Sequence, residues 1–174
     1  NIAERFNGIY GQTFKVPDPY IPKVGAKIMS LQDPTRKMSK SDENVNSYVA
    51  LLDKPDDIMR KFKRAITDSD AQVRYGEGKD GINNLMGIYS VMTGKTNEEI
   101  EREFDGKGYG DFKLAVGEAV VDHLRPIQEE FTRLIRDKAY LEQCYTKSAE
   151  IALRISQRTL DNAMKTVGFV KRAF

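Results

Sequence analysis

The sequence contains a single cysteine and a single histidine among its 174 residues. With Cys144 as the only thiol, no disulfide can form within the chain, and a reducing compartment such as the cytoplasm is expected. Cys144 has no histidine near it in the sequence and is expected to be a packed thiol. His123 has no second cysteine or histidine at ligand spacing, so we expect no metal site and place it on the surface or in the core of a helix.

Long hydrophobic runs and glycine-rich phosphate loops are also missing. No apolar run approaches the ~18 residues of a membrane span, so no membrane association is expected. Neither G-x-x-x-x-G-K-[ST] nor G-x-G-x-x-G occurs, which excludes the two common glycine-rich phosphate-binding loops. The net charge is only +2, from 28 Lys and Arg against 26 Asp and Glu. Any affinity for RNA must therefore come from local basic patches.

The chain does contain the pentapeptide K-M-S-K-S at residues 37–41. It follows a short apolar segment, residues 28–31, that is expected to be a strand, and it precedes a polar stretch typical of a loop. Ligands of α/β folds often bind where a strand ends in a loop. Two ammonium groups alternating with hydroxyl groups can bind the phosphates of a nucleotide. The residue types alone also fit an ordinary solvated loop.

The K-M-S-K-S string is the signature loop of class I aminoacyl-tRNA synthetases. Its surroundings resemble bacterial tryptophanyl-tRNA synthetases, and so do A-I-T-D-S at 65–69, V-R-Y at 73–75 and G-K-G-Y-G-D-F-K at 106–113. The resemblance covers nearly the whole chain, about residues 2–169. The H-x-G-H motif of these enzymes is missing, because the only histidine is His123. We therefore expect the C-terminal portion of a longer enzyme, inactive as an isolated fragment.

The resemblance implies a ligase that activates tryptophan with ATP and transfers it to tRNA(Trp). It also implies Mg²⁺ as a complex with ATP, a cytoplasmic location and a homodimer for the full-length enzyme. Lys37 and Lys40 are the expected catalytic residues, since they can stabilise the negative charge of the leaving pyrophosphate. The backbone of Ile28 is expected to meet the adenine, and Met38 is expected to anchor the loop by packing. The whole ATP-binding set is Ile28, Lys37, Met38, Ser39, Lys40 and Ser41.

We expect a mainly α-helical chain in two parts. Residues 1–53 are expected to form the C-terminal edge of a Rossmann-like α/β nucleotide-binding domain, with strands at 28–31 and 48–52. Residues 54–174 are expected to form an α-helical domain that binds the tRNA anticodon.

Proline, glycine and helix-capping residues predict several helix ends. Pro55 and the aspartates after it predict a helix start, and Gly94 predicts the end of a helix over 84–92. Thr96 and Glu99 form a capping-box pattern. A helix over 120–134 is expected to kink or to be divided at Pro126. A last helix is expected over 147–167, and residues 2–10 read as the end of another.

Two basic groups are candidates for RNA contact. Arg154, Arg158 and Asp161 share a stripe with Lys165 on the last helix, and the resemblance implies that they meet the tRNA anticodon. Four further cations follow the helix start at Pro55. For these the pattern favours a solvated helix face over contact with an RNA backbone. They are Arg60, Lys61, Lys63 and Arg64.

Two alternatives stay open at this point. The first is another class I synthetase, such as the tyrosine-specific one. The residues that would select the side chain of the amino-acid substrate are expected to lie mostly outside this sequence. The second is a stand-alone RNA-binding or scaffold module built from the helical part. Such a module would have no need of the K-M-S-K-S loop.

Overall fold

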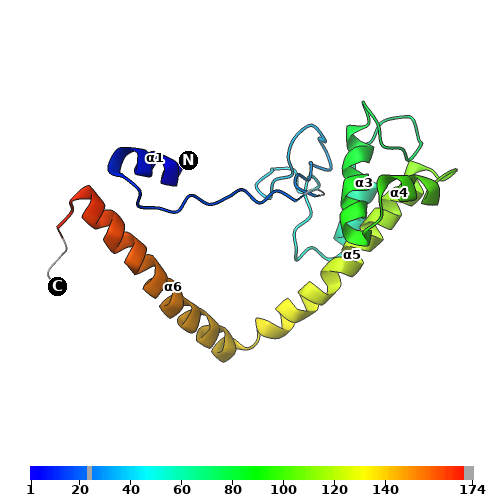
Figure 1. Ribbon diagram of the computed structural model, residues 1–174. Helices are drawn as coiled ribbons and strands as arrows, with labels where there is room; N and C mark the ends of the chain where they lie inside the picture. Colours follow the sequence, from blue (N-terminus) through cyan, green and yellow to red (C-terminus); the bar gives the residue numbers. More distant parts are fainter. Residues whose placement is uncertain (23–24, 171–174) are drawn as a thin grey trace. The chain divides into compact units, whose positions relative to one another are not determined.

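A computed structural model describes residues 1–22 and 25–170, and it is mainly α-helical (Figure 1). No named strand and no helix of membrane-spanning length and apolarity occurs in these ranges. The helices are α1 (Ile2–Tyr10), α2 (Pro55–Lys63), α3 (Asp80–Thr93), α4 (Asn97–Glu103), α5 (Tyr109–Leu134) and α6 (Lys138–Val167).

The chain divides into two compact units. One unit joins residues 1–20 with the C-terminal residues from Arg133 onward, and the other comprises residues 21–132. The expected domain boundary after residue 53 falls inside the second unit. The reason is that residues 28–53 pack on the helices that follow them.

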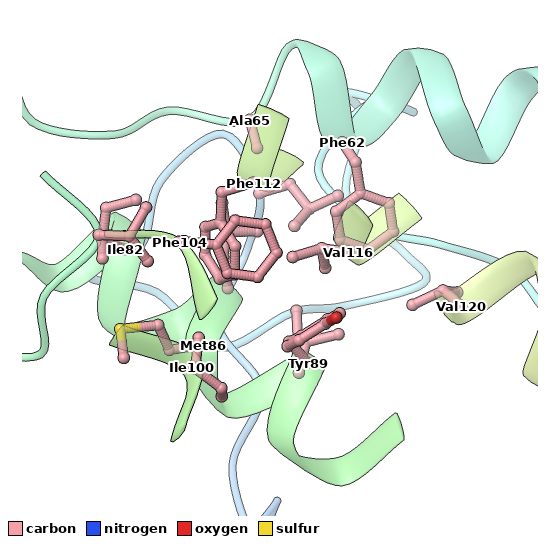
Figure 2. Close-up of a cluster of buried hydrophobic side chains, with 14 of the residues drawn as sticks. Phe62, Ala65, Ile82, Met86, Tyr89, Ile100, Phe104, Phe112, Val116 and Val120 are labelled. Atoms are coloured by element: carbon pink, nitrogen blue, oxygen red, sulfur yellow. The ribbon is translucent and has the colours of Figure 1, made fainter. Parts of the chain in front are cut away.

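The core of the second unit is an aromatic and aliphatic cluster contributed by α2, α3, α4 and α5 (Figure 2). The rings of Phe104 and Phe112 meet edge to face with centroids 4.9 Å apart, and the ring of Tyr89 lies 5.7 and 5.8 Å from them. Such edge-to-face contacts add to the free energy that the burial itself supplies. Leu31, which is 2% exposed, extends this core into the segment before α2.

Most of the predicted helix ends are confirmed. Pro55 occupies the first turn of α2, where its missing N–H costs no hydrogen bond. Gly94 and Gly168 end α3 and α6 in the left-handed conformation, at φ 76° and 89°. Thr96 and Glu99 form the complete capping box of α4, each side chain bonding the other's backbone N–H.

Three helices begin earlier than the ranges expected from the sequence. α3 starts at Asp80, α5 at Tyr109 and α6 at Lys138. α5 also continues through Pro126 and is not divided there. The proline ring removes one backbone N–H donor, so α5 continues there with one intrahelical hydrogen bond fewer.

The prediction of two strands is wrong. Within the described ranges, residues 28–31 form only an isolated antiparallel bridge between Met29 and Lys37, and residues 48–52 form no strand. The segment at 28–31 is extended, but most of its remaining backbone groups bond to a side chain and to loop backbone. A ladder of strand pairing therefore does not form.

The prediction of a packed thiol is also wrong. Cys144 is exposed on α6, a helix that has no buried residue in the described structure. His123 is exposed on α5, so of the two expected positions, on the surface or in the core of a helix, the surface position is the one found.

Candidate functional site

The K-M-S-K-S segment begins in the second arm of a short hairpin, in which residues 28–30 pair with residues 36–38. Ser30 N–H donates to the carbonyl of Arg36 at 2.8 Å, and Met38 N–H donates to the carbonyl of Ile28 at 3.0 Å. These bonds flank the bridge between Met29 and Lys37. They fix where the signature loop leaves the hairpin.

A tight polar turn closes this hairpin. Ser30 Oγ accepts from the backbone N–H groups of Gln32 and Asp33, both at 3.2 Å. Asp33 Oδ1 accepts from the hydroxyl of Thr35 at 2.6 Å and from its N–H at 3.1 Å. The hydroxyl bond, followed by the N–H bond, lowers the pKa of Asp33 below 3.8. The turn is therefore held by a charged carboxylate, as in other Asx turns.

Within the signature loop, one residue faces inward and the others face water. Met38 is half-buried and packs against the hydrophobic core, whereas Lys37, Ser39, Lys40 and Ser41 are exposed. The apolar anchor that the sequence predicts at Met38 is therefore present. Packing at this position holds the loop while leaving its polar side chains free to meet a ligand.

The two serines of the loop bond to each other. Their Oγ atoms are 2.9 Å apart, and Ser41 N–H also donates to Ser39 Oγ at 3.3 Å. Asp42 N–H donates to the carbonyl of Ser39 at 3.2 Å. The loop is thus a tight turn with hydroxyl groups gathered on its exposed side.

The loop carries uncompensated positive charge. Among the described residues, no acidic side chain pairs with Lys37 or Lys40. The neighbouring acid, Asp42, directs Oδ1 to the N–H of Asn44 at 2.9 Å. Two mobile ammonium groups without carboxylate partners, three positions apart, can follow and neutralise a polyanion such as a triphosphate.

Ile28 lies half-buried against the core at the base of this hairpin. Its carbonyl accepts from Met38, while its N–H makes no hydrogen bond within the described ranges. A free backbone N–H beside the loop is a donor that a ligand can use.

Two side chains that bond to the backbone of residues 28–53 could not be identified from the sequence. Asn84 of α3 bonds both backbone groups of Met29, from which it is 55 residues distant in the chain. Gln128 of α5 donates to the carbonyls of Leu51 and Asp53 at 2.8 and 3.0 Å. Both are ordinary polar residues on helices, and only the tertiary fold brings them to the segment at 28–53.

The predicted RNA residues on α6 lie in the other unit. Arg154 and Arg158 are exposed, and Asp161 is partly buried and accepts from Gln157 Nε2 at 2.8 Å. Arg158, Asp161 and Lys165 line one surface hollow of about 500 Å³ together with Thr13, and Arg154 is not part of its lining. The stripe on the helix is therefore present, but only part of it surrounds a concave surface.

The second basic group is divided by the fold. Lys61 is buried and paired with Asp53, whereas Arg60 pairs with Asp57 at 2.6 Å on the surface. Lys63 and Arg64 are exposed. The expectation of a solvated face is wrong for Lys61, because Asp53 offers it a partner beneath the helix.

The protein family described as tRNA synthetases class I (W and Y) matches residues 1–125, which is more than half of the chain. The chain belongs to this family of class I synthetases. Its signature loop therefore lies in the segment that the family defines.

Individual relatives narrow the comparison. The chain is 50% identical over 170 residues to the tryptophan–tRNA ligase of Wolinella succinogenes, covering 98% of this chain and 52% of that protein. It is 47% identical to the tryptophan–tRNA ligase of Clostridium tetani, covering 98% of this chain and 50% of that protein. The chain thus spans about half the length of the curated relatives that it matches.

Solved structures agree with the fold. Tryptophanyl-tRNA synthetase from Mycoplasma pneumoniae superposes with a TM-score of 0.84 at 27% identity, covering 98% of this chain and 53% of that one. The enzyme from Campylobacter jejuni, solved with ADP and tryptophan, gives a TM-score of 0.66 at 21% identity over 97% of this chain and 51% of that one. At this lower identity the likeness concerns the fold alone.

Proposed function

We propose that this chain is the C-terminal part of a tryptophan–tRNA ligase. The observation that carries the proposal is that Lys37 and Lys40 are exposed and have no acidic partner among the described residues, on a loop whose Met38 packs against the core. The choice of tryptophan is supported by relatives of that name at 45 to 50% identity. The parent enzyme joins tryptophan to ATP and passes the aminoacyl group to tRNA(Trp).

The first reaction needs positioning and charge stabilisation more than covalent help from the protein. A carboxylate oxygen of tryptophan forms a bond to the α-phosphorus of ATP, and the bond from that phosphorus to the bridging oxygen breaks. Pyrophosphate leaves with the electron pair of the broken bond. Lys37 and Lys40 act on the negative charge that gathers on this leaving group.

The rest of the hairpin supplies the nucleotide contacts. The backbone of Ile28 meets the adenine, and the hydroxyls of Ser39 and Ser41 donate to phosphate oxygens. Among the described residues, no group of three or more His, Cys, Asp or Glu could hold a metal ion. In this proposal Mg²⁺ would enter as a complex with ATP, bound to phosphate oxygens as is common for this ion.

The two parts of the chain have separate tasks in this proposal. Residues 1–53 form the C-terminal edge of a Rossmann-like nucleotide-binding domain, and residues 54–174 form the helical tRNA-binding domain. Arg154, Arg158 and Asp161 contact the anticodon. The full-length enzyme is a cytoplasmic homodimer.

ATP–pyrophosphate exchange tests the proposal. The full-length protein that carries this chain is expected to exchange pyrophosphate into ATP when tryptophan is present, and not when tyrosine replaces it. Residues 1–174 alone, verified by intact mass, are expected to give only the rate of a control without enzyme. Exchange driven by tyrosine, or by neither amino acid, contradicts the proposal.

A further inference from the structure

Asn84 of α3 clamps the backbone of Met29 with both ends of its side-chain amide. Oδ1 accepts from Met29 N–H at 2.8 Å, and Nδ2 donates to the Met29 carbonyl at 2.9 Å. Asn84 is only 9% exposed, so water competes little for these bonds. An amide is required here, because only Asn or Gln combines a donor and an acceptor in this way.

Asn84 bonds the hairpin arm that pairs with the start of the signature loop. The opposite edge of residues 28–30 pairs with residues 36–38, so Met29 lies between Asn84 and Lys37. Asn84 thus occupies the place that a neighbouring strand would take. On the edge that faces Asn84, Leu31 N–H donates to the carbonyl of Ser47 at 3.0 Å, and the carbonyl of Leu31 accepts from Ile66 N–H at 2.8 Å. Side-chain and loop groups thus bond to the hairpin edge that does not pair with residues 36–38.

We propose that Asn84 is a positioning residue for the signature loop, acting through Met29 on Lys37 and Lys40. This inference rests on the function proposed above. Without the amide, the N–H and carbonyl of Met29 lose their partners in a largely buried setting, and the hairpin must shift to satisfy them. A shift on the order of 1 Å at a charge-stabilising group is sufficient to slow a reaction about 100-fold.

The same helix offers a matched control. Asn83, the preceding residue, clamps Gly76 in the same manner, with Oδ1 accepting at 3.1 Å and Nδ2 donating at 2.7 Å. Asn83→Ala therefore removes the same two hydrogen bonds from the same helix. It frees the loop at 70–79 and leaves the signature hairpin untouched.

The kinetic test uses ATP–pyrophosphate exchange by the full-length enzyme. Asn84→Ala is expected to lower kcat about 10- to 100-fold, with a smaller change in the KM for ATP. Asn83→Ala is expected to stay within about threefold of wild type, because it lies away from the reacting groups. In a Lys40→Ala background, Asn84→Ala is expected to cost much less than it does alone. Full additivity of the two losses would mean general damage and would overturn the inference.

Hydrogen exchange of the same full-length variants gives a readout that does not depend on activity. Backbone amides of residues 28–38 are expected to exchange faster in Asn84→Ala and at the wild-type rate in Asn83→Ala, which should instead open residues 70–79. Unchanged protection of 28–38 in Asn84→Ala refutes the role of Asn84, whatever the kinetics. If wild-type enzyme lacks tryptophan-dependent exchange, the proposed function fails, and the protection of 28–38 still decides whether Asn84 holds the loop.

Discussion

The ammonium group of Lys61 lies 2.5 Å from Oδ2 of Asp53 and ties α2 to the end of the segment that carries the signature loop. The side chain of Lys61 is 6% exposed and that of Asp53 is 20% exposed. The same Oδ2 accepts from Ala50 N–H at 2.9 Å, and the ammonium group lies 5.0 Å from the centre of the Tyr48 ring. A cation that looks like one of a solvated cluster in the sequence is thus a structural link.

Replacing Lys61 should reduce stability. Lys61→Ala leaves a partly buried carboxylate without its cation, and the expected loss in free energy of unfolding is about 2–3 kcal/mol. Lys63→Ala, at an exposed position of the same helix, should change it by less than about 0.5 kcal/mol. Denaturant unfolding of the purified chain measures both. Equal losses would contradict the structural role of Lys61.

Two glycines of α3 should respond in opposite ways to alanine. A Cβ on Gly81 would lie 2.3 Å from the carbonyl oxygen of Ile66, so backbone must move, whereas a Cβ on Gly87 meets nothing within 4 Å. Gly81→Ala is therefore expected to destabilise the chain by at least about 2 kcal/mol, by overpacking. Gly87→Ala is expected to stabilise it by about 0.5–1 kcal/mol, through helix propensity. Thermal unfolding of both variants decides, and a stabilising Gly81→Ala would refute the close approach.

Tyr109 should control the titration of Asp68. Burial, the largest influence, raises the pKa of Asp68, but the Tyr109 hydroxyl bond at 2.6 Å, the Asp70 N–H bond and the charge of Lys79 together hold that pKa below 3.8. Because the folded-state pKa is depressed, the stabilisation is present above the unfolded value near 3.8 and is lost as pH falls through the folded value.

Tyr109→Phe should therefore raise the pKa of Asp68 and lower the free energy of unfolding by about 1–2 kcal/mol at neutral pH. The difference in free energy of unfolding from wild type should shrink as the pH falls through the folded-state pKa values of Asp68 in the variant and in wild type. Unfolding measured across this pH range, with carboxyl titration by NMR, tests the prediction. A difference that stays constant with pH would show that the hydroxyl acts without the charge of Asp68.

The helical part of the fold could be predicted largely from local chemistry. Pro55, Gly94 and the pair of Thr96 and Glu99 each act on backbone groups within one turn, so a short stretch of sequence contains the whole cause. The hairpin at residues 28–38 could not be predicted in this way. Its outer edge is closed by Asn84, and a contact across 55 residues leaves no mark on local pattern.

The candidate site shows the same division. Met38 can be recognised as an anchor because it is the apolar member of an otherwise polar string. Lys61 could not be separated from Arg60 and Lys63, because all three share the same chemistry. Its different fate depends on Asp53 lying beneath α2, which is a property of the tertiary structure.

Lys40→Ala in the full-length enzyme should affect the reaction more than the binding of ATP. Negative charge accumulates on pyrophosphate as it leaves, so the ammonium group stabilises the transition state more than the ground state. The expected loss in kcat for adenylate formation is about 10²–10³-fold, with a smaller change in the Kd of ATP. Single-turnover kinetics and equilibrium binding separate the two. Weak ATP binding with unchanged single-turnover chemistry would contradict the role assigned to Lys40.

The arginines of α6 should act on tRNA and not on tryptophan activation. Arg154→Ala or Arg158→Ala in the full-length enzyme is expected to raise the KM for tRNA and to leave ATP–pyrophosphate exchange intact. A contact with a base would be worth about 1–3 kcal/mol, and its loss should relax discrimination against an altered anticodon. A contact with a phosphate would instead weaken binding of all tRNAs and flatten the dependence on salt.

Aminoacylation of wild-type and anticodon-altered tRNA at two salt concentrations separates these outcomes. The lining of the hollow on α6 adds a difference between the two positions, since Arg158 belongs to it and Arg154 does not. If a nucleotide enters this hollow, Arg158→Ala should impair aminoacylation more than Arg154→Ala does. Lys147→Ala, an exposed cation earlier on the same helix, serves as the control for the loss of a single positive charge. Unchanged tRNA kinetics in both arginine variants would mean that the stripe is a solvated helix face.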